Sequence, residues 1–531
     1  MSVKINNISL EIDEEVEILK EKVAKKLNFS QESIIKVKIL RQSIDARKKD
    51  NIKYNYSLEV FAEKEDFILK HTRDKDIEFY KAGEREKIIF GDKKLIHRPI
   101  IVGFGPAGMF AALELARNGY KPLIFERGES VERRTETVNS FWQNGILNPN
   151  SNVQFGEGGA GTFSDGKLTT RIKDTRCDSV LAQFVRCGAP EEIIYSGKPH
   201  IGTDILKIVV KNIREEILKL GGEILFSHRL EDINFENSRM KSIIVNNMEI
   251  PCEVLVLAIG HSSRDTYEML YKNRIFMESK PFAIGVRIEH SQKLINLSQF
   301  GKFAEHPKLK AADYRLAHTC KSSGRAVYSF CMCPGGSVVA AASEHNMLVT
   351  NGMSDYKRNK ENANAALVVS VNRDDFKDSS PLAGMEFQRH NEGMAYTLGG
   401  GSYAAPIQLT QDFINDRTTK KLGNIQPTYK PGYKFSDLRQ CLPSYISEAL
   451  TEGLLVFNKK IKNFSDNNSI LTGIETRTSA PLRIIRNEKL QSINVEGLFP
   501  SGEGAGFAGG IISAAVDGIK SAESIMSEYI S

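Results

Sequence analysis

Apolar and polar positions alternate through much of the N-terminal part of the chain. The segments Lys4–Ile12, Ile34–Leu40 and Tyr54–Phe61 show the period of two that is typical of strands with one buried face. Val16–Leu27 instead repeats its apolar residues at helical spacing. The charged stretch Arg41–Lys53 is expected to be a solvent-exposed connection between two strands. This part of the chain is therefore predicted to fold as a small α+β domain.

Further along the chain, short apolar runs alternate with longer helical stretches. Ile100–Val102 is expected to be a buried strand, Pro106–Asn118 a helix, and the apolar run that follows a strand ending at Glu126. Asp204–Leu220 has the spacing of a helix, and Glu253–Ala258 that of another buried strand. Strands that alternate with helices in this way predict a parallel sheet covered by helices.

The same alternation returns only at the end of the chain. Leu498–Ser501 is expected to be a strand, and a helix is expected to follow from Gly510. We therefore predict that an early and a late segment fold together around an insertion. The expected domains are an N-terminal α+β domain at 1–95, the first part of a parallel-sheet domain at 96–270, an inserted mixed α/β domain at 271–470 and the last part of the parallel-sheet domain at 471–531.

Three glycines between the first strand and its helix indicate what the sheet binds. Gly103, Gly105 and Gly108 have G-x-G-x-x-G spacing. They would allow a tight turn, close approach of the backbone to a pyrophosphate, and close packing of the helix on the strand. The helix N-terminus would hold phosphate charge. Glu126 is placed to accept a hydrogen bond from a ribose hydroxyl, so the segment predicts dinucleotide binding.

Composition adds limits rather than a function. The chain has 531 residues, of which 41% are hydrophobic and 26% charged, and a net charge of +6, too small to suggest a nucleic-acid-binding protein. We find neither the apolar core of a signal peptide nor an apolar run long enough to span a membrane. Seven scattered cysteines do not suggest a disulfide framework, and no metal-ligand spacing appears. We expect a cytoplasmic protein without a metal site.

Several blocks together resemble a known family. They are GFGPAG and FERG in the first nucleotide-binding segment, GEGGAGTFSDGKL at 156–168, VLAIGHSSRDTYEML, YSFCMCPGG at 328–336, ETRTSAPLRI at 475–484 and SGEGAGFAGGIISAAVDGIKSA at 501–522. In these blocks the chain resembles the bacterial, functionally uncharacterised FAD-dependent dehydrogenases, or NAD(P)/FAD-dependent oxidoreductases, which have a glutathione-reductase-like FAD domain. The resemblance covers essentially the whole chain.

This resemblance implies a fold and a function. The fold would be α/β: a Rossmann-like three-layer FAD-binding domain with an inserted mixed α/β substrate domain and the N-terminal α+β domain. FAD would be bound without a covalent link and would carry hydride to or from an unidentified small molecule. We find no second strand–glycine–helix unit for a nicotinamide dinucleotide, so NAD(P)H would at most bind transiently. The alternative is a flavoprotein that acts on RNA, with the N-terminal domain as its recognition module.

The residues expected to hold FAD come from the glycine turn and its acid, from the blocks at 156–168 and near Gly260, and from the C-terminal block. Glu503 would contact the ribityl–phosphate part of FAD, again by resemblance. The full set is Gly103, Gly105, Pro106, Ala107, Gly108, Glu126, Arg127, Arg134, Gly158, Gly159, Gly161, Thr162, Ala258, Gly260, Gly502, Glu503, Gly509, Gly510 and Ile511.

The residues expected to take part in catalysis are less well defined. His200 and His261 stand beside glycine-bearing loops and could act as acid or base near neutral pH, or could be hydrogen-bonded structural residues. Arg477 could hold a substrate carboxylate or a flavin carbonyl, or be structural. Cys331 and Cys333 could be a redox pair, but dense packing near the active site is the favoured interpretation.

Overall fold

The computed structural model describes residues 2–63, 65–66, 68, 72–81, 83, 85 and 88–531. Its N-terminal domain has strands β1 (Ser2–Glu11), β2 (Ile34–Asp45), β3 (Lys53–Ala62) and β4 (Ile77–Tyr80), with helix α1 (Leu19–Leu27). The antiparallel sheet has the order β2-β3-β1-β4. The predicted strand–helix–strand–strand order is confirmed. The prediction that the whole of Arg41–Lys53 is a connection is wrong, because β2 pairs with β3 as far as Asp45.

A five-stranded parallel sheet forms the nucleotide-binding domain, in the order β24-β12-β6-β7-β8. Its strands are β6 (Ile100–Val102), β7 (Leu123–Glu126), β8 (Glu223–Phe226), β12 (Leu255–Leu257) and β24 (Leu498–Pro500). An early and a late segment therefore share one sheet. Alternate residues point to opposite faces of each strand, and this sets the two layers that cover the sheet.

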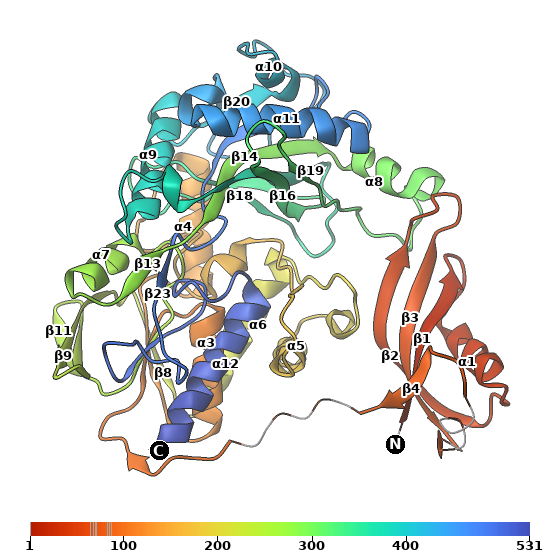
Figure 1. The fold of residues 1–531 in the computed structure, drawn as a ribbon, viewed down its shortest axis with the longest axis horizontal. Helices are drawn as coiled ribbons and strands as arrows, with labels where there is room; N and C mark the ends of the chain where they lie inside the picture. Colours follow the sequence, from red (N-terminus) through yellow and green to blue (C-terminus); the bar gives the residue numbers. More distant parts are fainter. Residues whose placement is uncertain are drawn as a thin grey trace.

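Helices cover one face of this sheet and a strand layer covers the other. Ile101 and Val256 pack among α3 (Pro106–Arg117), α6 (Thr203–Lys219) and α12 (Ile511–Glu528). Ile100 and Leu255 pack instead against the antiparallel strands β9 (Leu230–Glu236), β10 (Arg239–Val245) and β11 (Met248–Pro251). In Figure 1 the C-terminal helix α12, in dark blue, runs alongside α3.

Three further α-helices and two short paired strands belong to this half. They are α4 (Val131–Asn144), α5 (Arg176–Arg186), α7 (Arg264–Lys272), and the paired strands β5 (Lys93–Lys94) and β25 (Tyr529–Ile530).

The inserted domain is built on a seven-stranded mixed sheet with the order β15-β16-β19-β14-β22-β20-β21. The strands are β14 (Phe282–Ser291), β15 (Ala317–Thr319), β16 (Ala326–Cys333), β19 (Asn362–Val371), β20 (Ala405–Leu409), β21 (Tyr433–Phe435) and β22 (Ile470–Glu475). The sheet thus continues past residue 470, where the sequence placed the end of the insertion. Figure 1 shows this domain above the nucleotide-binding domain.

Helices and a hairpin complete the inserted domain. These are α8 (Gln292–Phe300), α9 (Ala383–Leu398), α10 (Thr410–Ile414), α11 (Ser444–Lys460) and the hairpin of β17 (Ser337–Ala340) with β18 (Thr350–Met353). Where the chain passes between the two domains, β13 (Met277–Ser279) pairs with β23 (Leu482–Ile484). Within the described ranges, no helix combines the length and apolar character needed to cross a membrane.

The N-terminal domain stands beside the other two and contacts both (Figure 1). The Tyr54 hydroxyl donates to the carbonyl of Lys308 at 2.5 Å, in the inserted domain. The backbone amide of Gln42 donates to the carbonyl of Tyr195, in the nucleotide-binding half, at 2.7 Å.

Candidate active site

A cavity of about 410 Å³ lies at the carboxyl ends of the parallel strands and extends to the inserted sheet. In open parallel sheets this end is where ligands bind. The FAD-side wall, as we name it, consists of the lining residues from the glycine turn, Glu126, the 159–161 segment, the 258–263 segment and the start of α12. The insertion-side wall consists of Lys167 and the lining residues Phe330, Cys331, Asn351, Glu475 and Arg477.

The glycine turn is shaped by backbone contacts that exclude side chains. Gly103 has a left-handed φ of +96°, and a Cβ there would lie 2.3 Å from the carbonyl oxygen of Ala258. A Cβ on Gly108 would lie 1.9 Å from the carbonyl oxygen of Gly103. The first glycine thus permits the turn, and the third permits α3 to pack on it, as the spacing predicted.

The carboxylate of Glu126 ties three loops together at the cavity. Its Oε2 accepts from the amide of Phe104 at 2.7 Å, and its Oε1 accepts from the amides of Gly128 and Gly156 at 2.8 and 2.9 Å. A carboxylate has about four acceptor sites, so one remains for a ribose hydroxyl. Glu126 also lines the cavity, where the sequence placed it.

Arg134 supports the 156–168 loop from behind rather than lining the cavity. Its buried guanidinium donates to the carbonyls of Asn152, Val153 and Glu157 at 2.9, 3.0 and 2.6 Å. Burial lowers the pKa of Arg134 to about 10. Thr162 also turns inward and donates to the carbonyl of Glu157 at 3.2 Å. Both residues shape the loop by holding carbonyl oxygens that would otherwise be unpaired.

The start of α12 provides room for a flat, anionic group. A Cβ on Gly509 would meet no described atom within 4 Å, and one on Gly510 only the hydroxyl of Ser513 at 3.9 Å. Gly260, on the facing loop, is equally open. No described side chain caps the N-terminus of α12. The glycines therefore leave space in the cavity beside a positive helix end, which suits the isoalloxazine ring and phosphates of FAD.

Most of the predicted cofactor residues line the cavity. They are Gly103, Gly105, Pro106, Ala107, Glu126, Arg127, Gly159, Gly161, Ala258, Gly260, Glu503, Gly509, Gly510 and Ile511. Those that lie behind the lining are Gly108, Arg134, Gly158, Thr162 and Gly502. Gly502 has a left-handed φ of +76°, and a Cβ there would lie 2.6 Å from the Cβ of Ala107.

The structure separates the two candidate histidines. His261 lines the cavity, with Nδ1 3.6 Å from a Glu503 carboxylate oxygen, while its buried Nε2 has no hydrogen-bond partner among the described residues. His200 lies outside the lining. Its ring stacks on Tyr356, its Nε2 contacts the Tyr356 carbonyl at 3.0 Å, and burial lowers the pKa of His200 to about 4. A neutral, stacked imidazole there fits a structural role.

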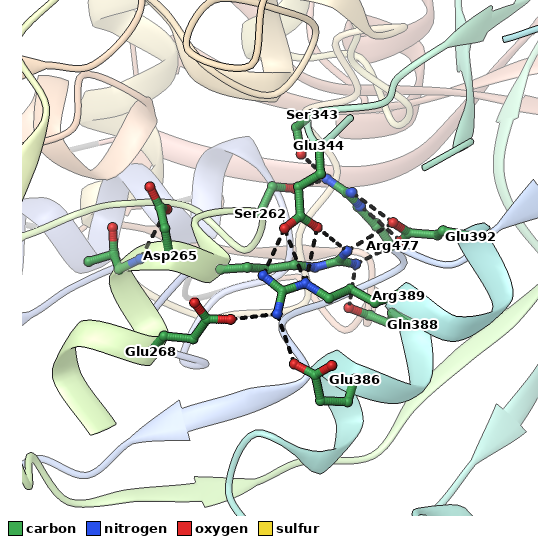
Figure 2. Close-up of polar contacts among 12 residues, drawn as sticks. Ser262, Asp265, Glu268, Ser343, Glu344, Glu386, Gln388, Arg389, Glu392 and Arg477 are labelled. Atoms are coloured by element: carbon green, nitrogen blue, oxygen red, sulfur yellow. Dashed lines mark hydrogen bonds and ion pairs between the residues drawn. The ribbon is translucent and has the colours of Figure 1, made fainter. Parts of the chain in front are cut away.

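Arg477 reaches the cavity but its guanidinium is already bound. Figure 2 shows it between Ser262, Ser343 and Glu392, to which it donates at 3.0, 2.5 and 2.9 Å. Glu392 also accepts from Arg264 of α7 at 2.7 Å. The pKa of Glu392 falls to about 2, because the two arginines outweigh the effect of burial. This buried cluster joins α7 to α9 and fixes the insertion above the cavity.

The insertion-side wall includes Glu475, which was not predicted from the sequence, and Lys167, which belongs to the 156–168 block that was expected to lie at the cofactor. Burial raises the pKa of Glu475 to about 7, although Arg287 lies 3.1 Å from its carboxylate. Of these two buried groups, Glu475 is the one whose charge changes near neutral pH, because the guanidinium of Arg287 stays protonated at any physiological pH. Lys167 Nζ donates to the carbonyl of Met332 and pairs with Asp165 at 2.8 Å. Arg287, which lies with Glu289 and His290 in the largely apolar strand β14, was a signal in the sequence.

The structure also brings Glu452 next to two potential metal ligands, His318 and Cys320, that are far from it in the sequence. His318, Cys320 and Glu452 have ligand atoms within 4.8 Å of one another, far from the cavity lining. Glu452 accepts from His318 Nε2 at 2.7 Å and from the amide of Lys321 at 2.9 Å. These hydrogen bonds, which link α11 to β15 and the turn after it, explain why the three side chains lie together. The expectation that the protein has no metal site therefore stays a prediction.

Comparison with known proteins assigns the chain to a family. A protein of Clostridium beijerinckii, described only as an uncharacterized protein, is 59% identical over 529 residues, which cover 100% of this chain and 99% of that one. The chain belongs to the same family. Residues 281–478 match the model "FAD-dependent protein, C-terminal domain-like", and residues 2–61 match a domain of unknown function, DUF8436. FAD is the cofactor of this family member, as the resemblance implied, and it is a dinucleotide, as the glycine turn and Glu126 predicted.

Similarity to solved structures is weaker. Glycine oxidase from Bacillus cereus has a TM-score of 0.32 at 12% identity, over 81% of this chain and 96% of that one. A flavin-dependent brominase has a TM-score of 0.35 at 12% identity, over 81% and 79%. Similarities of this size carry no argument about the reaction.

Proposed function

We propose that this protein is an FAD-dependent oxidoreductase that acts on a small molecule at the insertion-side wall, with an FAD domain of the glutathione-reductase type. The observation that carries the proposal is one continuous cavity with two different walls. One wall is glycine-rich and ends at the N-terminus of α12; the other holds Lys167, Cys331 and Glu475. Space for a flavin on one side and ionisable groups on the other is what a flavin-dependent reaction needs.

Each part of the FAD-side wall would have its own task. The turn at Gly103 and Gly105 would hold the pyrophosphate, and Glu126 the adenosine ribose. The N-terminus of α12 would lie near the pyrimidine edge of the flavin, where reduction places negative charge. Aligned amides and the helix dipole would stabilise that charge and so raise the reduction potential. FAD itself, once bound, supplies the two-electron chemistry.

The insertion-side wall would bind and orient the substrate. Burial raises the pKa of Glu475 to about 7, so its carboxyl group could donate or accept a proton at neutral pH. Lys167 could pair with an anionic substrate group, since it faces the cavity beside Asp165. His261, with its unpartnered Nε2, is a second group able to hold a proton at the cavity.

The test is the cofactor of the purified protein. We expect a yellow protein that releases FAD, and not FMN, on heat denaturation, because Glu126 and the glycine turn need an adenine dinucleotide. Chromatography of the released flavin distinguishes the two. Anaerobic photoreduction of the bound flavin should then bleach its absorbance band reversibly. Release of FMN, or no flavin after incubation with FAD, would contradict the proposal.

A further inference from the structure

Two cysteines at the end of β16 are presented to the cavity in an unusual backbone geometry. Cys331 lines the cavity, and Cys333 lies fully buried behind it. Cys331 has a φ of +42°, in the left-handed region that costs a non-glycine residue free energy. The pairing of β16 with β19 shifts register between Phe330 and Cys333. A bulge of this kind redirects a side chain, and here the redirected side chain is a thiol at the cavity.

Hydrogen bonds hold this bulge in place from both sides. Arg287 of β14 donates to the carbonyl of Cys331 at 2.7 Å and lies 3.5 Å from the sulfur of Cys333. Lys167 donates to the carbonyl of Met332. Two cations therefore donate hydrogen bonds to backbone carbonyls of the bulge, and their charges lie beside the two sulfur atoms.

The two thiols differ in their affinity for a proton. A hydrogen bond from Cys333, followed by the charges of Lys167 and Arg287, lowers the pKa of Cys331 to about 5. The same hydrogen bond raises the pKa of Cys333 well above its ordinary value. Thiolate, and not thiol, is the nucleophile in sulfur chemistry. The pair thus has one sulfur ready to attack and one that keeps its proton.

The negative groups that face Cys331 are paired with cations, two of which, Lys167 and Arg287, also lie beside the sulfur atoms. Asp165, on the 156–168 loop, is bound by Arg358 at 2.9 Å and by Lys167 at 2.8 Å. Glu475 of β22 is bound by Arg287 at 3.1 Å, and the Cys331 sulfur helps to raise its pKa. A negative sulfur at Cys331 is therefore matched by nearby positive charge and compatible with both carboxyl groups.

We propose that Cys331 and Cys333 are a redox-active thiol pair that exchanges two electrons with FAD across the cavity. Cys331 would attack one sulfur of a small-molecule disulfide, the second sulfur of the substrate leaving as a thiolate. Cys333 would then lose its proton to that thiolate and attack the Cys331 sulfur, which releases the other half of the substrate and forms a Cys331–Cys333 disulfide. Two electrons, which bound FAD would pass on from a reduced nicotinamide dinucleotide, and one proton would restore the Cys331 thiolate and the Cys333 thiol. The pair thus deepens the proposed function and names its substrate class.

The first experiment measures the thiols of the purified protein with 5,5′-dithiobis(2-nitrobenzoate) at pH 6. Cys177 is partly exposed like Cys331, but burial raises its pKa, so Cys177→Ser is the matched control and also the background for the other variants. We expect two coloured thiolates per protein and a Cys331–Cys333 disulfide, detected by peptide mass spectrometry. Cys333→Ser should release one and keep a mixed disulfide on Cys331. Equal labelling in Cys331→Ser would overturn the assignment.

The pH dependence of alkylation by iodoacetamide gives a second readout. Between pH 6.5 and 8 the rate at Cys331 should change by less than about twofold, because it is already a thiolate, whereas the rate at Cys177 should rise by about thirtyfold. A rate at Cys331 that rises in parallel with Cys177 would show an ordinary thiol and contradict the proposal.

Anaerobic titration of the FAD-loaded protein with dithionite separates the two proposals. After the pair has been oxidised with 5,5′-dithiobis(2-nitrobenzoate) and the reagent removed, the wild type and Cys177→Ser should take up about four electrons, and Cys331→Ser, treated in the same way, about two. Bound FAD with uptake of only two electrons by the wild type would overturn the thiol pair and leave the flavin function intact. A protein that binds no FAD would overturn the flavin function, and with it electron exchange by the pair.

Discussion

The two walls of the cavity are built in opposite ways. The FAD-side wall comes from short, contiguous segments and works mainly through what it lacks: Gly103, Gly509 and Gly510 leave room for the cofactor. The insertion-side wall is made of buried ionisable side chains from separate strands, among them Cys331 and Glu475. A wall that provides space can be recognised from local sequence, whereas a wall that provides reactivity depends on which charges are brought together.

The largest effect is expected from distorting the FAD-side wall from behind, at Gly108. Gly108→Val should abolish FAD binding, because even a Cβ at this position would lie 1.9 Å from the carbonyl oxygen of Gly103. Titration of the flavin-free protein with FAD measures the loss. Gly432→Ala is the matched control, since a Cβ there meets no described atom within 4 Å, and it should bind FAD normally. Normal affinity in the valine variant would show that the turn does not hold the cofactor.

The next effect tests whether buried charge fixes the second wall in place. Glu392→Gln should lower the free energy of unfolding by about 3–5 kcal/mol, because it leaves Arg264 and Arg477 short of a buried partner. Denaturation with urea measures the change. Glu386→Gln removes an exposed partner of Arg389 and should cost at most about 1 kcal/mol. Equal losses in the two variants would argue against the buried cluster as the link between domains.

A smaller, pH-dependent effect is expected at Glu475. Its folded-state pKa of about 7 lies above that of the unfolded chain, so the folded state favours the protonated form. This contribution to stability is complete below the unfolded pKa and is lost as the pH rises through about 7. Glu475→Gln resembles the protonated form. It should therefore gain stability relative to the wild type between about pH 5 and 8, by at most about 3 kcal/mol.

Urea denaturation at several pH values measures this difference in stability. The thiol beside Glu475 offers a second test of the same pKa. The Cys331 sulfur raises the pKa of Glu475. In Cys331→Ser the loss of stability should thus be complete at a lower pH. A difference between Glu475→Gln and the wild type that does not change with pH would mean that Glu475 stays ionised.

The smallest effect is expected at His200, outside both walls. His200→Gln can keep a donor near the Tyr356 carbonyl, so the dissociation constant of FAD should change by less than about twofold, or about 0.4 kcal/mol. His261→Gln, which alters a cavity residue, should change the flavin absorbance spectrum. A large loss of FAD affinity in His200→Gln would extend the site beyond the cavity described above.

The sequence was most informative where local rules decide the structure. The strand at Ile100, the helix from Pro106 and the strand that ends at Glu126 are confirmed, because their glycines, proline and apolar spacing act within a few residues. The N-terminal domain was predicted by the same patterns, except that β2 extends into a charged segment. Pairing with β3 overrode the polar composition there.

By itself, the sequence therefore determined the FAD-side wall: a dinucleotide-binding turn, the glutamate that follows it, and a glycine-rich helix start, which meet at one sheet. Only the tertiary structure decided which groups form the insertion-side wall. It placed Arg287 and Lys167 beside Cys331, removed His200 from the cavity and tied Arg477 to Glu392. The physical reason is that a glycine's role follows from its own backbone, whereas the pKa of a thiol or carboxyl follows from burial and from charges on other strands.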